Sequence, residues 1–119
     1  GFYYSPTILC DLNEKMRVFT EEVFGPVALV FKVDDDASAI ELANASEFGL
    51  GASVWSKDLD RAMMVARKIE SGTVFINSYT KSDPRMPFGG IKKSGLGREL
   101  SHFGLKEFCN IKAYNLYDC

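Results

Sequence analysis

Apolar and polar positions follow one another in blocks that predict strands alternating with helices. Three short apolar runs are typical of strands buried on both faces, namely residues 27–33 (VALVFKV), 52–56 (ASVWS) and 73–77 (TVFIN). Stretches with helical spacing of apolar residues separate them. Strand, helix, strand, helix, strand with short links is an α/β layout, for which parallel pairing with right-handed crossovers is the default. Shorter apolar runs at 7–10 and 109–117 predict a first and a last strand.

Acidic residues mark where the two expected helices begin. Residues 34–36 (DDD) precede the first helix, and Asp58 precedes the second. Their side-chain oxygens can cap free backbone amides, and the helix dipole favours negative charge there. We expect the first helix to end near 48–49 and Gly72 to stop the second.

Residues 78–98 form a long stretch rich in glycine, proline and charge. A loop of this length in a compact domain is usually functional or disordered. Its apolar residues Met86, Phe88 and Ile91 predict that it is ordered. A helix is expected to follow at 99–107.

Length, charge and cysteine content narrow the function classes. The chain has 119 residues and a net charge of -2, which suits one domain and argues against a nucleic-acid partner. No apolar run has the length of a membrane span. Cys10, Cys109 and Cys119 form no CxxC pair, and one His is too few for the common zinc patterns. We therefore expect free thiols, no metal site and a reducing, cytoplasmic setting.

Short motifs in the chain identify no catalytic group. The glycine clusters at 49–51, 89–90 and 95–97 complete neither a dinucleotide-binding fingerprint nor a P-loop, so we interpret them as tight turns. His102 has no paired ligand and is expected to be packed or on the surface. No serine lies in a G-x-S-x-G context. The residues alone predict an α/β domain with an ordered glycine- and proline-rich loop.

The segment EEVFGP, residues 21–26, places two acidic residues beside an aromatic residue and a turn. A surface helix end would need Glu21 and Glu22 but not Phe24. A turn in the core would need Phe24 but not the two acids.

Along essentially its whole length the chain resembles the C-terminal part of the aldehyde dehydrogenase superfamily. The motifs that carry the resemblance are PTIL (6–9), EEVFGPV (21–27), ANASEFGLGASVWS (43–56), ESGTVFIN (70–77) and PFGGIKKSGLGREL (87–100). The stretches FINSYTKSDPRMPFGG and GRELSHFGLKEFCNI are similar to bacterial succinate-semialdehyde dehydrogenases. The resemblance implies an α/β fold with a parallel-type sheet. Residues 1–108 would be the C-terminal portion of the catalytic domain, and 109–119 an oligomerisation strand or tail.

The resemblance also assigns cofactor contacts, with NAD or NADP as the cofactor. Glu22 would accept hydrogen bonds from the hydroxyls of the ribose next to the nicotinamide. Phe24 would lie by the nicotinamide ring and limit its position. Glu21 is expected to be simply solvated, and solvation at a helix end is the alternative for Glu22.

Substrate contacts are implied for the long loop. Phe88 matches the aromatic residue that walls the family's substrate tunnel, and Ser82 and Asp83 match positions that vary with substrate. Small or polar residues there fit a short polar aldehyde such as succinate semialdehyde. Lys81 and Arg85 could attract a substrate carboxylate, although solvated surface charges explain them equally well.

Other residues of the loop are expected to shape it. Gly89 and Gly90 would allow close backbone approach, while Lys92, Ser94 and Arg98 would hold the loop in place.

In this family the catalytic cysteine, the general-base glutamate and the dinucleotide-binding domain precede the segment matched here. None of the three cysteines has the family's catalytic context, so we assign no catalytic residue to this chain. We expect it to be inactive alone and to need the missing N-terminal portion of the enzyme. The resemblance also implies that residues 109–119 pair with a neighbouring subunit, which would make the enzyme a homo-oligomer. The alternative is a stand-alone, non-catalytic binding or assembly module with the same fold.

Overall fold

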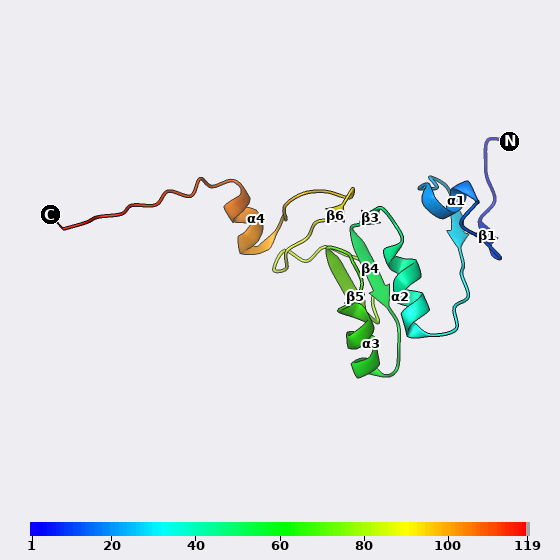
Figure 1. The fold of residues 1–119 in the computed structure, drawn as a ribbon. Coiled ribbons are helices and arrows are strands. Elements are labelled where there is room, and N and C mark those ends of the chain that lie inside the picture. The colour runs from blue at the N-terminus through cyan, green and yellow to red at the C-terminus, as the bar shows by residue number, and fades with distance from the viewer. Residues whose placement is uncertain (119) are drawn as a thin grey trace. The chain divides into compact units, whose positions relative to one another are not determined.

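The computed structural model describes residues 1–118 and forms two compact units, Gly1–Glu47 and Phe48–Cys119. Figure 1 shows the elements in chain order. The first unit contains β1 (Thr7–Leu9), α1 (Arg17–Thr20), β2 (Val27–Leu29) and α2 (Asp36–Asn44). The second contains β3 (Phe48–Gly49), β4 (Gly51–Val54), α3 (Leu59–Ala66), β5 (Thr73–Ile76), β6 (Ile91–Lys92) and α4 (Ser101–Glu107).

In the first unit β1 and β2 are parallel, with Thr7 opposite Val27 and Leu9 opposite Leu29. The strand predicted over residues 27–33 is therefore shorter than its apolar run, because β1 offers only three partner residues. Beyond the pair, the rings of Phe19 and Phe31 meet edge to face with centroids 5.6 Å apart. This is a favoured aromatic geometry and gives the unit a small apolar cluster.

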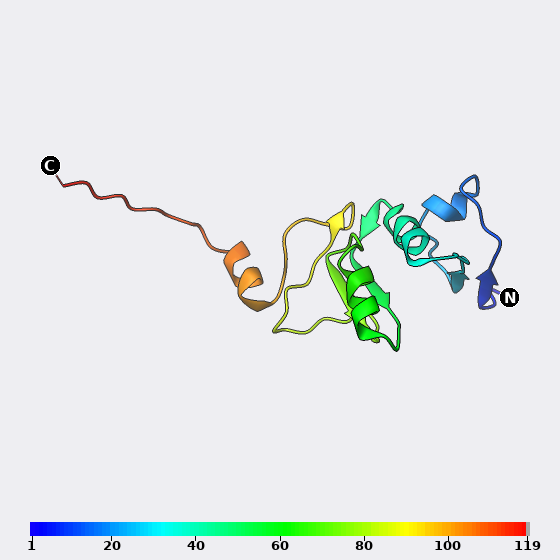
Figure 2. The ribbon, with the colours of Figure 1, turned by 60° about the horizontal axis from the view of Figure 1, so that its bottom comes forward.

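The second unit is built on a β–α–β element. β4 and β5 pair in parallel, and α3, which connects them, packs on both strands. Figures 1 and 2 both show α3 lying beside the two strands. Ala62 of α3 has 1% of its surface exposed and is the buried hydrophobic residue of the described chain. The parallel crossover predicted from the apolar pattern is confirmed here.

Both predicted helix starts are confirmed. Asp35 caps α2, since its side chain accepts a hydrogen bond from the backbone N–H of Ser38 at 2.8 Å. Asp58 caps α3 in the same way, accepting from the N–H of Arg61 at 3.0 Å. Each cap satisfies an amide that has no partner within its helix.

The role predicted for Gly72 is wrong. α3 ends at Ala66, and its C-cap residue Arg67 keeps a right-handed conformation. Gly72 lies later, where its N–H donates to the carbonyl oxygen of Gly49 at 2.9 Å. A Cβ on Gly72 would overlap the carbonyl oxygen of Gly89. Gly72 is therefore required for the close approach of two backbone segments, not for ending a helix.

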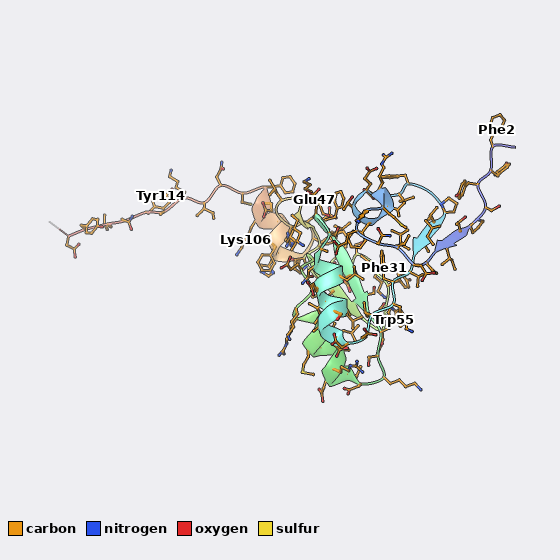
Figure 3. All side chains as sticks on the ribbon, turned by 45° about the vertical axis from the view of Figure 1, so that its right-hand side comes forward. Phe2, Phe31, Glu47, Trp55, Lys106 and Tyr114 are labelled. Atoms are coloured by element: carbon orange, nitrogen blue, oxygen red, sulfur yellow. The ribbon has the colours of Figure 1, made fainter. Side chains whose placement is uncertain are left out.

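The C-terminal segment follows α4, whose predicted position at 99–107 is close to the observed Ser101–Glu107. Residues 110–118 are assigned to no strand, and their side chains are exposed. Figure 3 labels Tyr114 on this segment; Ile111 is 98% exposed and Leu116 95%. A strand requires a hydrogen-bonded partner, so the oligomerisation strand at 109–119 stays a prediction.

Candidate functional site

The two acids of EEVFGP have different surroundings. The Arg17 guanidinium donates from Nε and Nη2 to the Glu21 carboxylate at 2.8 and 2.7 Å, one helical turn away. These hydrogen bonds, with the attraction between the charges, lower the pKa of the Glu21 carboxyl below its ordinary value. The expectation that Glu21 is simply solvated is therefore wrong. Within residues 1–118 no such pair occupies the exposed carboxylate of Glu22.

Phe24 lies two residues beyond Glu22 and is 91% exposed. The chain turns directly after it, with the N–H of Val27 donating to the Gly25 carbonyl oxygen at 2.8 Å. The Pro26 carbonyl oxygen accepts from the N–H of Thr7 at 2.9 Å, which ties the turn to β1. An unpaired carboxylate and an open aromatic face therefore stand together where the chain enters β2. A carboxylate only accepts hydrogen bonds, so together with an exposed aromatic ring it fits a group that brings hydroxyls and a flat ring.

A pocket of about 360 Å³ lies in the second unit. One side is formed by β5 and the residue before it, and the other by the loop that follows β5. Its lining residues are Gly72, Thr73, Val74, Phe75, Lys81, Asp83, Met86, Pro87 and Phe88. Four of the residues singled out in the loop, Lys81, Asp83, Met86 and Phe88, thus meet at one pocket. Ser82 is exposed and does not line it.

Asp83 and Arg85 form a closed ion pair at the edge of this pocket. Arg85 donates from Nη2 to Asp83 Oδ2 at 2.6 Å, from Nε to Oδ1 at 3.0 Å and from its backbone N–H to Oδ1 at 2.9 Å. These bonds hold the pKa of the Asp83 carboxyl well below its usual range and raise that of Arg85. Lys81 carries its Nζ 5.6 Å from the centre of the Tyr79 ring.

The loop that carries Phe88 is fastened at its base. The backbones of Phe88 and Glu99 exchange two hydrogen bonds, at 2.9 and 2.8 Å. Arg98 Nη1 donates to the carbonyl oxygens of Gly90 at 2.9 Å and Gly97 at 2.6 Å. One guanidinium thus spans the two arms of the loop and satisfies carbonyls that no strand partner reaches.

Two further contacts fasten the tip of the loop, where β6 pairs with β3. Ser94 Oγ accepts from the buried N–H of Gly49 at 2.9 Å. Lys92 Nζ lies 2.8 Å from Glu70 Oε2. The structural role predicted for Lys92, Ser94 and Arg98 is confirmed by these contacts.

The predicted close approaches at the paired glycines are also confirmed. A Cβ on Gly90 would come within 2.5 Å of Ser94 Cβ, and one on Gly89 within 2.9 Å of the Gly97 carbonyl oxygen. Both distances are shorter than side chains tolerate.

Asn77 is a residue that the sequence reasoning missed. It follows β5 in a left-handed conformation, with φ 52°. Its Oδ1 accepts from the N–H of Ser56 at 2.9 Å, and its Nδ2 donates to the Ser56 carbonyl oxygen at 2.8 Å. The side chain therefore continues the β4–β5 ladder by one step. The available signal was an Asn at a strand end, because Asn tolerates this conformation better than most residues.

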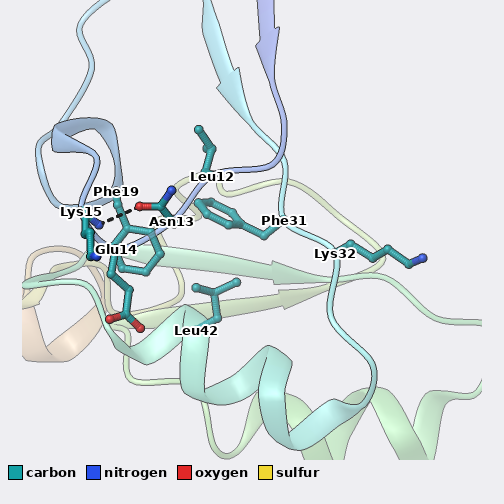
Figure 4. A pocket seen from close by; sticks show the side chains of 8 residues that line it. All are labelled: Leu12, Asn13, Glu14, Lys15, Phe19, Phe31, Lys32 and Leu42. Atoms are coloured by element: carbon teal, nitrogen blue, oxygen red, sulfur yellow. Dashed lines mark hydrogen bonds between the residues drawn. The ribbon is translucent and has the colours of Figure 1, made fainter.

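A second pocket, of about 560 Å³, lies within the first unit and is drawn in Figure 4. The rings of Phe19 and Phe31 and the side chain of Leu42 face it. The backbone N–H of Lys15 donates to Asn13 Oδ1 at 3.1 Å at its rim. Its polar lining residues are Asn13, Glu14, Lys15 and Lys32, and they include no group of three His, Cys, Asp or Glu side chains that could hold a metal ion.

Other candidate groups are separate from these sites. Cys10 and Cys109 are free and exposed, and Cys119 lies outside the described residues. The ring of His102 lies against that of Phe103, with centroids 4.1 Å apart. Residues 1–118 contain no cluster of three His, Cys, Asp or Glu side chains able to hold a metal ion. Nor does this range contain a helix long and apolar enough to span a membrane.

The parallel β–α–β element and the fastened glycine-rich loop define an α/β segment of the kind found in dehydrogenase catalytic domains. Residues 1–114 match the sequence profile of the Aldehyde dehydrogenase family, and the chain belongs to that family.

Curated relatives of this chain include two bacterial enzymes named for one substrate. The chain is 53% identical over 112 residues to succinate-semialdehyde dehydrogenase [NADP(+)] 1 of Mycobacterium ulcerans. It is 54% identical over 112 residues to succinate semialdehyde dehydrogenase [NAD(P)+] Sad of Escherichia coli K12. Each alignment covers 94% of this chain and 24% of the relative, so the chain spans about a quarter of their length.

A solved structure agrees with the fold. Succinic semialdehyde dehydrogenase from Streptococcus pyogenes, in complex with NADP+, superimposes with a TM-score of 0.88 at 45% sequence identity. The match covers 97% of this chain and 26% of that one.

Proposed function

We propose that this chain is the C-terminal part of an NAD(P)-dependent aldehyde dehydrogenase that oxidises succinate semialdehyde to the acid. The observation that carries the proposal is the identity of more than half of 112 aligned residues with two enzymes named for this substrate. The alignments cover 94% of this chain, so most of the segment contributes to this likeness.

For the cofactor, the proposal assigns the exposed carboxylate of Glu22 and the ring of Phe24. One ionised carboxylate can accept hydrogen bonds from both ribose hydroxyls, and charge-assisted bonds of this kind are strong. Phe24 then restricts where the nicotinamide ring can lie. When bound, the nicotinamide group accepts a hydride, and this chain contributes by binding and orienting it. The ion pair between Arg17 and Glu21 leaves Glu22 as the available acid.

For the substrate, the proposal assigns Phe88 as a wall of the pocket, with Asp83 at its edge and Ser82 beside it on the exposed face. Phe75 and Phe88 both line the pocket and give it apolar walls. The catalytic cysteine and the general base would come from the part of the enzyme that precedes this segment. The chain alone is therefore expected to be inactive.

A chimeric enzyme tests the proposal. Residues 1–114 replace the matching C-terminal segment of the Escherichia coli relative Sad. We expect this chimera to form NAD(P)H with succinate semialdehyde, and the isolated chain to form none. A chimera that folds, as judged by circular dichroism and a cooperative thermal transition, but oxidises no aldehyde would overturn the proposal.

A second candidate is a stand-alone binding or assembly module. The exposed apolar residues of the C-terminal segment, including Ile111 and Leu116, favour it, because an unpaired apolar segment is a site for association. The same segment would join subunits in a homo-oligomer of the full enzyme. Sedimentation of the isolated chain distinguishes the stand-alone module from the enzyme segment. A defined, stable oligomer favours the module. Association without a defined size favours the enzyme segment, whose apolar face the rest of the enzyme would cover.

A further inference from the structure

We propose that Lys81 is the cation that recognises the carboxylate of an anionic aldehyde, and that Arg85 acts indirectly by neutralising Asp83. This inference rests on the proposed function and assigns the substrate selectivity of the same pocket. Lys81 and Arg85 were equivalent candidates in the sequence, and the structure separates them.

The first argument is position. Lys81 and Asp83 both line the pocket between β5 and its following loop, whereas Arg85 does not. The Arg85 side chain is 86% exposed, and the Asp83 side chain only 33%. A carboxylate held inside the pocket would therefore lie beside Lys81, which lines it, and not beside Arg85.

The second argument is hydrogen-bonding capacity. The Arg85 guanidinium uses Nε and Nη2 on Asp83, in the two-pronged geometry that Arg prefers with a carboxylate. To bind a substrate through that face, Arg85 would have to leave Asp83 and expose a negative charge beside an anion. The Lys81 ammonium lies over the Tyr79 ring and forms no ion pair within residues 1–118. Its donors therefore remain available.

The third argument is charge. An unpaired Asp83 carboxylate at the pocket edge would repel an anionic substrate. The backbone N–H of Arg85 and its guanidinium cover both Asp83 oxygens, so the pair has no net charge. The remaining charge at the pocket is that of Lys81. Around it, the apolar side chains of Phe75, Met86 and Phe88 suit the short carbon chain of the aldehyde.

The test compares an anionic with a neutral aldehyde of the same chain length, succinate semialdehyde and butanal, in the chimera described above. The readout is kcat/KM for succinate semialdehyde divided by kcat/KM for butanal. Dividing the two values cancels any loss of activity that is common to both substrates. The variants are Lys81→Gln, Arg85→Gln and the double variant Arg85→Gln/Asp83→Asn. Removing Lys81 should lower the ratio about fivefold, the upper range for one exposed ion pair.

The Arg85 variants distinguish shielding from direct binding. Arg85→Gln should also lower the ratio, because Asp83 then repels the anion. Adding Asp83→Asn should restore it. A double variant that stays as low as Arg85→Gln alone would make Arg85 the recognition residue and overturn the inference. A ratio unchanged in Lys81→Gln would overturn it as well.

If the chimera oxidises neither aldehyde, the proposed function fails, and binding to the 119-residue chain decides the inference separately. The probe is succinate, with butyramide as the neutral control, followed by NMR of backbone amides and the Lys81 side chain. Succinate should shift the signals of Lys81 and Phe75, and the shifts should disappear in Lys81→Gln. Equal shifts with butyramide, or none with succinate, would overturn the inference.

Discussion

The side-chain oxygen of Ser94 accepts a hydrogen bond of 2.9 Å from the backbone N–H of Gly49, 45 residues earlier in the chain. Gly49 is buried, so its N–H has no access to water as an alternative partner. The bond fastens the tip of the glycine-rich loop to β3 and thereby supports the segment that carries Phe88.

Ser94→Ala should destabilise the chain by about 1–3 kcal/mol, the cost of leaving a buried amide without a partner. Urea unfolding followed by circular dichroism measures the free energy of unfolding. Ser82→Ala is the matched control, since Ser82 is exposed, and it should change this free energy by less than about 0.5 kcal/mol. Equal effects of the two substitutions would show that the bond to Gly49 contributes nothing.

Gly72→Ala adds a single methyl group and should lower the free energy of unfolding by about 3 kcal/mol or more. The added Cβ would overlap the Gly89 carbonyl oxygen, and backbone cannot move aside as a flexible side chain can. Gly25→Ala adds the same methyl where nothing lies within 4 Å, so it should be tolerated. Comparable melting temperatures for the two variants would contradict the close approach.

At Asn77 two substitutions can be compared, and which of the two variants is the more stable tests the backbone conformation. Both Asn77→Ala and Asn77→Gly remove the two hydrogen bonds to Ser56. Only alanine must also adopt the left-handed conformation at φ 52°, at a cost of about 1 kcal/mol. Asn77→Gly should therefore be the more stable variant by about that amount. At an ordinary strand position alanine would be the better residue, so the opposite order would rule out the conformational requirement.

The pair of Asp83 and Arg85 predicts a dependence on pH. The pKa of Asp83 in the folded chain is lowered, mainly by hydrogen bonds from the Arg85 side chain. Its stabilising contribution is therefore present above the unfolded value of about 4 and is lost as the pH falls through the lower, folded pKa. Carboxyl ¹³C NMR should show Asp83 titrating below the other aspartates. Arg85→Gln should return its pKa toward the ordinary range, and an Asp83 curve unaffected by that change would contradict the pairing.

Features specified by neighbouring residues were predictable from the sequence. Asp35 and Asp58 cap the helices that follow them, and two apolar runs separated by a helix became the parallel β4–β5 pair. The ion pair between Arg17 and Glu21 also has a local signal, an i,i+4 spacing of opposite charges, which was overlooked because the short α1 lacks a clear apolar period.

Several features that depend on distant contacts have no local pattern that would predict them. β3 and β6 have two residues each and pair antiparallel, so neither has a run long enough to be recognised. Gly72 follows a helical pattern and was therefore interpreted as the end of that helix. A glycine is required there because the backbone of Gly89 lies too close for a side chain, and no local pattern indicates this contact. Likewise, nothing in the sequence distinguishes Lys81 from Arg85 until the contact with Asp83 is known.

The central claim is that this segment holds the nicotinamide ribose of the proposed enzyme through Glu22. The most direct measurement is the KM for NADP+ of the chimera carrying Glu22→Gln, compared with the chimera carrying Glu21→Gln. Loss of a hydrogen bond to a charged group should raise the KM of the Glu22 variant at least about tenfold. The Glu21 variant should change little, because Glu21 is occupied by Arg17. Equal KM values for the two variants would contradict the claim.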